Sequence, residues 1–325
     1  MTMAIRVHET GGPEVMKWEE VQVGDPGPGE ARIKHTAIGL NFIDTYFRSG
    51  LYPSPTGLPF TPGNEGAGTV EAVGEGVTQV SVGDRVAYVG PPGSYAEQRV
   101  IAAALLVKIP DGVSDDTAAA MMLKGMTARY LLRKTFVIDA GTTLLFHAAA
   151  GGVGLIAGQW ARHIGATAIG TVGSEEKAEL ARANGYNHVI NYRTENFVER
   201  VKEITGGAGC DVVYDSVGKD TFPGSLDCIR PLGTWVTFGQ SSGPLPAINL
   251  GILSQKGSLF VTRPTLFSYI AARQDLEETA GDLFDVVKSG AVKIYVNQSY
   301  PLAEAQRAHE DLEGRKTTGQ TVLKP

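Results

Sequence analysis

The fold of this 325-residue chain is decided by the stretch Thr142-Thr143-Leu144-Leu145-Phe146-His147-Ala148-Ala149-Ala150-Gly151-Gly152-Val153-Gly154. It begins like a buried parallel strand, and the residues after it repeat at helical spacing. A glycine turn between such a strand and a helix predicts a doubly wound α/β sheet that binds a dinucleotide at the helix N-terminus. Gly151 and Gly152 would let backbone N–H groups approach a pyrophosphate, and Gly154 would allow close helix–strand packing. Ala149 replaces the first glycine of the usual fingerprint, which the turn accepts if the φ of Ala149 is negative.

A second passage, Thr171-Val172-Gly173-Ser174-Glu175-Glu176-Lys177, ends the next predicted strand, Thr167–Val172. Dinucleotide-binding folds normally carry here an Asp or Glu that binds the adenosine ribose 2′-OH. This chain instead offers Ser174, which can donate to a 2′-phosphate, and Lys177 one helical turn further on. The passage therefore predicts NADPH rather than NADH. The alternative is that Lys177 is a solvated surface lysine whose charge the two preceding glutamates partly offset.

Length, charge and cysteine content limit the organisation and the partners of the chain. With 325 residues it exceeds one typical domain, so two domains are expected. A net charge of −6 argues against nucleic-acid binding as the main task. Only Cys210 and Cys228 are present, which indicates a reducing compartment without a disulfide framework. No apolar run approaches the ~20 residues of a membrane span, so a cytoplasmic protein is expected.

Residues 1 to about 120 contain short predicted strands that are separated by turns rich in glycine and proline. Many short strands of this kind are typical of a partly open β-barrel. We expect the barrel strands at Met3–Val7, Ala31–Ile38, Gly68–Val73, Arg85–Val89 and Glu97–Ala102.

Helical patterns begin at Asp115–Met121 and continue through Thr127–Lys134, after which strands and helices alternate. This alternation predicts a six-stranded parallel sheet, to which the strands before and after the glycine turn belong. The other four strands are expected at His188–Asn191, Val212–Asp215, Trp235–Phe238 and Ser258–Thr262.

The last part of the chain is predicted to return to the barrel. It offers helices at about 269–288 and 303–313 and a final strand at Thr321–Leu323. The expected domains are a barrel domain of residues 1–123 and 263–325 and a dinucleotide-binding domain of residues 124–262.

Six motifs carry a family resemblance that spans nearly the whole chain. They are Gly39-Leu40-Asn41-Phe42-Ile43-Asp44, Pro62-Gly63-Asn64-Glu65-Gly66-Ala67-Gly68, Val82-Gly83-Asp84-Arg85-Val86, Gly125-Met126-Thr127-Ala128, Ala148–Gly154 and Tyr214-Asp215-Ser216-Val217-Gly218. In this order they resemble the zinc-independent quinone oxidoreductases, the zeta-crystallin-like branch of the medium-chain dehydrogenase/reductase superfamily, in its bacterial NADPH-dependent form. The resemblance implies a GroES-like, partly open β-barrel that carries the catalytic residues and a Rossmann domain that binds NADPH.

Two positions distinguish this chain from the zinc-dependent alcohol dehydrogenases, which are similar in fold. Those enzymes place a cysteine where this chain has Asn41 and a histidine where it has Asn64, and an amide is a poor zinc ligand. Their structural zinc needs four clustered cysteines, whereas no cysteine here precedes Cys210. The six histidines are scattered without the spacing of metal ligands. We therefore expect no metal.

Without a Lewis acid an unactivated carbonyl is difficult to polarise, whereas a quinone accepts an electron pair readily. The resemblance thus implies that a hydride or electrons pass from NADPH to a quinone, with the nicotinamide held against it in a cleft between the domains. The nearest alternative is an NADPH-dependent enone or 2-alkenal reductase, because an activated C=C accepts a hydride in the same geometry. An NADPH-sensing RNA-binding module and a crystallin-like protein without turnover are further alternatives, which the acidic charge and the intact glycine turn oppose.

The resemblance also assigns residues to the reaction site. The candidate catalytic residues are Tyr46, Tyr52 and Asn41, and the two hydroxyls would donate a proton or orient the substrate. The alternative for both tyrosines is aromatic packing at the barrel edge. Asp44 is expected to fix its loop, and Glu65 to hold a backbone group or an arginine. The residues expected at the nicotinamide end are Asn41, Phe42, Tyr46, Thr127 and Tyr130.

The remaining cofactor contacts also follow from the resemblance. Arg315, after the last helix, would anchor the cofactor from the barrel domain, unless it is simply a C-terminal arginine that the helix dipole favours. The others lie at the carboxyl edge of the sheet, where open parallel sheets bind ligands. They are Gly151, Gly152, Val153 and Gly154 for the pyrophosphate, Gly173, Ser174 and Lys177 for the 2′-phosphate, Tyr192 for the adenosine, and Val217, Phe238, Gly239, Ser241, Pro264 and Leu266 after the later strands.

The predicted strand Ser258–Thr262 would be an edge of the dinucleotide sheet. It is apolar and has no protective charge or proline before Arg263, so it invites pairing with another strand. The resemblance implies a homodimer in which two such edges join.

Overall fold

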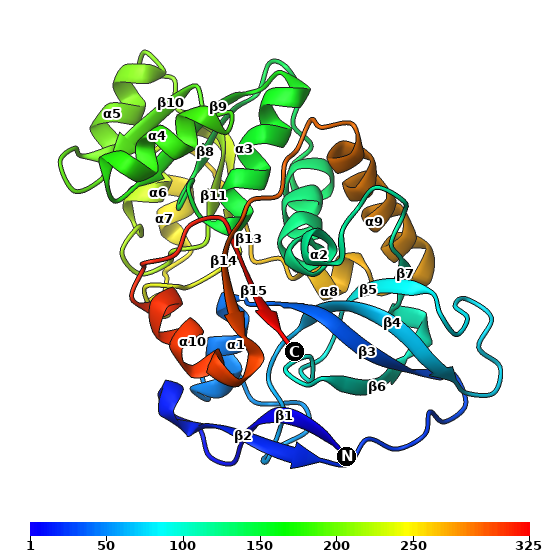
Figure 1. Cartoon of the computed structure of the whole chain (residues 1–325). Helices are drawn as coiled ribbons and strands as arrows, with labels where there is room; N and C mark the ends of the chain where they lie inside the picture. The colour runs from blue at the N-terminus through cyan, green and yellow to red at the C-terminus, as the bar shows by residue number, and fades with distance from the viewer. The chain divides into compact units, whose positions relative to one another are not determined.

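The computed structural model describes residues 1–325, which form two compact units. Figure 1 labels their helices and strands. Within the second unit, the side chain of Gln159 makes two hydrogen bonds with the backbone of Lys293. Nε2 of Gln159 donates to the carbonyl of Lys293 (3.1 Å), and the N–H of Lys293 donates to Oε1 of Gln159 (2.9 Å). This pair holds the short segment 285–293 in that unit. The first unit is Met1–Met126, Ile270–Phe284 and Ile294–Pro325, and the second is Thr127–Tyr269 and Asp285–Lys293.

The second unit contains a six-stranded sheet in which every neighbouring pair is parallel, as predicted. The strand order β10-β9-β8-β11-β12-β13 places the glycine-turn strand β8 near the middle, where the order reverses. Val213 of the central strand lies between Leu145 and Trp235, and all three are buried. The strands are β8 (Thr143–Phe146), β9 (Thr167–Val172), β10 (His188–Asn191), β11 (Cys210–Asp215), β12 (Ile229–Thr237) and β13 (Phe260–Thr262).

Helices connect these strands, and capping residues mark where some of them begin or end. Gly165 ends α3 in the left-handed conformation (φ 94°), which glycine adopts without strain. Asn196 caps α5 by accepting hydrogen bonds from two backbone N–H groups. Figure 1 shows α4 and α5 beside β10 at one end of the sheet. The helices are α3 (Gly152–Ile164), α4 (Glu175–Ala183), α5 (Phe197–Ile204), α6 (Gly224–Asp227), α7 (Gly251–Gln255) and α8 (Leu266–Tyr269).

The first unit is built on a mixed sheet in the order β14-β15-β3-β4-β5-β7, with β6 paired to β3, and a separate hairpin of β1 and β2. The sequence did not predict β2 or β14, because exposed polar residues fill both strands and hide the alternation. The strands are β1 (Thr2–Val7), β2 (Met16–Val21), β3 (Glu30–Gly39), β4 (Glu65–Val73), β5 (Arg85–Val89), β6 (Gln98–Ala102), β7 (Val107–Lys108), β14 (Val296–Pro301) and β15 (Gln320–Lys324). The helices of this unit are α1 (Phe42–Arg48) and α10 (Ala305–Glu313), and α9 (Arg273–Lys288) begins in it.

The helical pattern that the sequence shows from Asp115–Met121 through Thr127–Lys134 forms a single helix, α2 (Asp115–Tyr130), and a π-helical turn over Leu131–Thr135 follows it. In the structure a Cβ at Gly125 would lie 2.6 Å from Cδ1 of Leu283, so this glycine allows α2 to pack closely against α9. Ser114 caps the helix by accepting a hydrogen bond from the N–H of Thr117 (3.2 Å).

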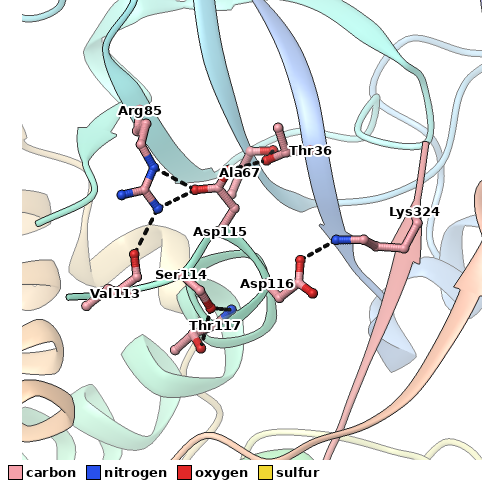
Figure 2. Close-up of polar contacts among 9 residues, drawn as sticks. All are labelled: Thr36, Ala67, Arg85, Val113, Ser114, Asp115, Asp116, Thr117 and Lys324. Carbon is pink, nitrogen blue, oxygen red and sulfur yellow. Dashed lines mark hydrogen bonds and ion pairs between the residues drawn. The ribbon is translucent and has the colours of Figure 1, made fainter. Parts of the chain in front are cut away.

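The first turn of α2 is tied to three strands of the first unit, as Figure 2 shows. Asp115 accepts hydrogen bonds from Arg85 of β5 (Nε, 2.9 Å) and from the hydroxyl of Thr36 of β3 (2.7 Å). Asp116 pairs with Lys324 of β15. Two carboxylates in the first turn also complement the helix dipole. The strands therefore fix the position of α2 along its axis.

Apolar side chains fill the interior of each unit. One cluster of the first unit includes Ile5, Leu40 and Tyr95, and the main cluster of the second includes Leu145 and Trp235. No helix is both long and apolar enough to cross a membrane.

Candidate functional site

The glycine turn after β8 has the geometry that the sequence predicts. Its left-handed residue is Ala148 (φ 57°), whereas Ala149 does not have a positive φ, so alanine fits that position. A Cβ on Gly154 would lie 2.5 Å from the carbonyl oxygen of Ala148 and 2.6 Å from that of Ala149. Only glycine therefore lets the first turn of α3 approach the end of β8 this closely. With Gly151 as the N-cap, the helix N-terminus offers its dipole to an anion.

The end of β9 carries the residues predicted to choose the cofactor. The Ser174 hydroxyl caps α4 by accepting a hydrogen bond from the N–H of Lys177 (3.3 Å), which leaves its own hydrogen to donate. A Cβ on Gly173 would lie 2.5 Å from the hydroxyl oxygen of Tyr192. Tyr192 is 44% exposed, so its ring stands at the surface above the end of β9.

The loops after β11 and β12 are bonded to each other at the same edge of the sheet. The N–H of Phe238 donates to the carbonyl of Asp215 (2.8 Å), and the N–H of Ser241 donates to that of Ser216 (3.1 Å). Gly239 fits there because a Cβ would lie 2.7 Å from the carbonyl oxygen of Ser216. The structure thus brings the predicted residues of these loops together. Further along the chain, Pro264 is half-buried and Leu266 is buried.

Thr127 and Tyr130 lie in the last turn of α2 and are buried. The ring of Tyr130 stacks on that of Tyr269, with the ring centroids 4.5 Å apart. Burial, followed by the neighbouring Tyr269, raises the pKa of Tyr130, so its hydroxyl stays protonated.

In the first unit, Asn41 is the N-cap residue of α1 and is buried. Its N–H donates to Oδ2 of Asp44 (2.9 Å), and its Nδ2 donates to Oε1 of Glu65 (2.8 Å). Asn64 donates its Nδ2 to the carbonyl of Gly90 (2.9 Å). The Oδ1 atoms of both asparagines are buried acceptors with no hydrogen-bond partner in the chain. Such atoms are costly unless another molecule donates to them.

Glu65 is the centre of a buried polar cluster to which Asn41, Leu123 and Lys124 contribute. Its Oε2 accepts a hydrogen bond from the N–H of Leu123 (2.6 Å), and Nζ of Lys124 lies 3.6 Å from its Oε1. Glu65 therefore holds a backbone group, as predicted, but its cation is a lysine and not an arginine. Burial raises the pKa of Glu65 and lowers that of Lys124, while their mutual attraction opposes both shifts.

Asp44 ends a chain of buried hydrogen bonds. Arg48 donates to Nδ1 of His309 (2.9 Å), so the imidazole can donate from Nε2 to the Tyr95 hydroxyl (3.0 Å), which in turn donates to Oδ2 of Asp44 (3.0 Å). Burial lowers the pKa of His309 to about 3, which keeps the ring neutral. Burial raises the pKa of Asp44 to about 7, although the hydrogen bonds from Asn41 and Tyr95 oppose this shift. Asp44 thus fixes the start of α1, as predicted.

The replacement Asp44→Asn is expected to change the pH dependence of stability. Below about pH 4 the carboxyl is protonated in both states, whereas between pH 4 and 7 only the unfolded state releases the proton. Because the folded pKa is the raised one, the wild type should lose up to about 4 kcal/mol relative to the variant as the pH rises through this range. Urea unfolding at several pH values measures this difference. Asp25→Asn, at a carboxylate that is 96% exposed, is the control, and parallel curves for wild type and Asp44→Asn would contradict the prediction.

Tyr46 and Tyr52 pack edge to face, with ring centroids 5.2 Å apart, and Phe42 lies 6.3 Å from Tyr46. The N–H of Tyr52 also donates to the carbonyl of Tyr46 (3.0 Å). The aromatic packing that was the alternative for these residues is therefore present. Arg315 is exposed just beyond α10 and adopts the left-handed conformation (φ 58°).

Several residues of these sites escaped the sequence analysis. Lys124 gives one signal, because it is a single charge in the otherwise apolar run Ala118–Met126. A lysine in such a run is buried if the helix is buried on all sides. Arg48, Tyr95 and His309 give none, since they are distant in sequence and meet only in the fold.

The donor set around Asn41 does not fit zinc. Asn41 and Asn64 are amides, and Glu65 is already engaged by Lys124 and by a backbone N–H. No group of three or more His, Cys, Asp or Glu side chains in the chain could hold a metal ion.

Comparison with known proteins identifies the family. Residues 27–111 match the alcohol dehydrogenase GroES-like domain, and residues 152–285 match the family described as zinc-binding dehydrogenase. A quinone oxidoreductase of Pseudomonas aeruginosa is 56% identical over the whole of both chains. The crystal structure of Escherichia coli quinone oxidoreductase complexed with NADPH superposes with a TM-score of 0.98 at 52% identity, and the match covers 99% of this chain and 100% of that one. A 2-haloacrylate reductase of a Burkholderia species is 50% identical over 100% of this chain and 99% of its own. The chain therefore belongs to the quinone oxidoreductases of the medium-chain dehydrogenase/reductase superfamily.

Proposed function

We propose that this protein is an NADPH-dependent quinone reductase that needs no metal. The observation that carries the proposal is the similarity over the full length to quinone oxidoreductases, one of which is solved with NADPH. The glycine turn, the carboxyl-edge loops and a donor set unsuited to zinc agree with it. The test is NADPH oxidation by the purified protein with a panel of quinones, and the expected result is turnover that added zinc does not increase and that chelators do not reduce.

The cofactor would be held by the second unit at the carboxyl edge of its sheet. There Gly151, Gly152, Val153 and Gly154 would bind the pyrophosphate through backbone N–H groups and the dipole of α3. The adenosine would lie between the end of β9 and Tyr192. The further contacts that we propose on this unit are Thr127, Tyr130, Gly173, Ser174, Lys177, Val217, Phe238, Gly239, Ser241, Pro264 and Leu266.

On the first unit, the residues that we propose for the reaction are Asn41, Phe42, Tyr46 and Tyr52, with Arg315 as a further cofactor contact. Bound NADPH supplies a hydride, or electrons, from nicotinamide C4. Asn41 would accept a hydrogen bond at Oδ1, which has no partner within the chain. Phe42 would provide an apolar wall, and the hydroxyls of Tyr46 and Tyr52 would orient the quinone or donate a proton to its reduced oxygen.

Replacing the two groups proposed for the 2′-phosphate should abolish the preference for NADPH. Ser174→Ala and Lys177→Ala are each expected to raise the KM for NADPH about 10-fold and to leave that for NADH unchanged, because NADH has no 2′-phosphate. Steady-state kinetics with both cofactors measure the effect. Lys202→Ala, at an exposed lysine on α5, is the control for lost charge. Equal losses with NADPH and NADH would contradict the assignment.

A second candidate function has a specific observation in its favour, namely the 2-haloacrylate reductase that is 50% identical. A C=C bond conjugated to a carbonyl or carboxylate can accept a hydride in the same arrangement as a quinone. Comparing kcat/KM for quinones, enones and 2-haloacrylates at saturating NADPH distinguishes a quinone reductase from a reductase of conjugated C=C bonds.

We also propose a homodimer that forms through β13, which is an edge strand of its sheet. Phe260 and Val261 on it are 62% and 41% exposed, and an apolar edge with unpaired backbone groups favours strand pairing. Sedimentation at micromolar concentration should give a dimer, and Val261→Lys should give a monomer.

A cytoplasmic location is proposed as well, since both cysteines, Cys210 and Cys228, are free and buried.

A further inference from the structure

Asp215, the last residue of β11, is a fully buried carboxylate with five hydrogen-bond donors. Its Oδ1 accepts from the N–H groups of Val217 (2.9 Å) and Gly218 (3.1 Å). Its Oδ2 accepts from the hydroxyls of Thr221 (2.8 Å) and Ser225 (2.9 Å) and from the indole N–H of Trp235 (3.4 Å). Such saturation holds the loop after β11 in one conformation.

A buried histidine extends this arrangement to the neighbouring strand. Because the Ser225 hydroxyl donates to Asp215, it can accept a hydrogen bond from Nε2 of His147 (3.1 Å). Nδ1 of the same ring then accepts from the Thr171 hydroxyl (2.9 Å). Each group therefore donates its hydrogen to the next, in the order Thr171, His147, Ser225, Asp215. Because Nδ1 of His147 accepts a hydrogen bond in this order, the imidazole must be neutral. Burial lowers the pKa of His147, which agrees with it.

The series joins the parts of the chain that form the carboxyl edge of the sheet. His147 directly precedes the glycine turn, and the carbonyl of Thr171 accepts a hydrogen bond from the N–H of Ala149 within that turn (3.0 Å). Thr171 also lies just before the end of β9, and the carbonyl of Asp215 accepts the N–H of Phe238 after β12 (2.8 Å). Four loops, after β8, β9, β11 and β12, thus depend on one buried network.

We infer that Asp215, acting through His147, Ser225 and Thr171, is a positioning residue that fixes these four loops in the arrangement that receives NADPH. This inference rests on the proposed cofactor site. None of the four side chains needs to touch the cofactor, because all are buried. Their contribution is to preorganise backbone N–H groups, so that less conformational entropy is lost when the dinucleotide binds.

The test uses a pair of variants that differ by one hydroxyl. Thr171→Val keeps the size of the side chain and removes the donor to His147, whereas Thr171→Ser keeps the donor. We expect Thr171→Val to raise the Kd for NADPH, measured by cofactor fluorescence, about five- to tenfold, and Thr171→Ser to stay within about twofold of wild type. Ser225→Ala, which removes the link between His147 and Asp215, should behave like Thr171→Val. At saturating NADPH, kcat and the quinone KM should change less than about twofold.

Cys228→Ala is the control for loss of stability. Cys228 is buried in the same unit but precedes β12, at the opposite edge of the sheet. It should lower the melting temperature and leave the Kd unchanged. If Thr171→Val and Thr171→Ser bind NADPH alike, or if Cys228→Ala weakens binding as much, the network is only structural and the inference is overturned. If Ser174→Ala and Lys177→Ala also leave the Kd unchanged, the cofactor site itself is wrong and the inference fails with it.

Discussion

Gly154→Val is expected to abolish NADPH binding, with a rise in Kd of at least about 100-fold. The new Cβ would meet two backbone carbonyl oxygens, at 2.5 Å and 2.6 Å, and neither can move without shifting the glycine turn or the start of α3. Both elements belong to the proposed pyrophosphate site, so a displacement of about 1 Å there removes several contacts together. Fluorescence titration with NADPH and thermal unfolding measure the two consequences.

The matched control is Gly281→Ala. Gly281 lies within α9, and a Cβ there would meet no atom within 4 Å. This variant should bind NADPH like the wild type and gain about 0.5–1 kcal/mol of stability, because alanine is the better helix former. Normal NADPH binding by Gly154→Val would show that the turn does not hold the cofactor.

Lys124→Met is expected to cost about 3–5 kcal/mol of unfolding free energy, which is large for one substitution. Lys124 donates to the carbonyl of Leu40 (2.8 Å) and lies beside the fully buried Glu65. Without the ammonium, that carboxylate is left with an uncompensated charge. Since Glu65 also holds the side chain of Asn41, turnover should fall as well.

Neutralising the carboxylate should rescue this variant. The double replacement Lys124→Met with Glu65→Gln removes both charges, so a double-mutant cycle by urea unfolding should recover at least about half of the lost free energy. A Lys124→Met protein within about 1 kcal/mol of wild type would show that the pair contributes little.

The sequence predicted the elements whose pattern is local. The strands Thr167–Val172 and Arg85–Val89 have the predicted bounds, because each is a stretch rich in apolar and β-branched residues between clear turn residues. The edge strand near residue 260 is shorter than predicted. The close approach of Gly125 to Leu283 could not be predicted, because it depends on a partner distant in sequence.

The candidate site likewise has one part that could be predicted from local sequence and other parts that could not. The glycine turn is visible in the sequence because its spacing carries the physical requirement. The cluster around Glu65 and the network around Asp215 are not, because their members come from different elements and each would be an ordinary polar residue elsewhere. Neither hydropathy nor spacing indicates that Arg48 and His309 are neighbours.

The pairing of β15 with β3 has a consequence for how the polypeptide acquires its structure during synthesis. Val322 pairs with Gly39, so the sheet of the first unit joins residues from near both ends of the chain. The β8–β13 sheet lies entirely within residues 143–262 and can form while the ribosome is still translating. The N-terminal strands must wait for the last ones with an open edge, and such long-range contacts fold slowly and expose aggregation-prone strands. Chaperone demand at expression should therefore come from the N-terminal third of the chain.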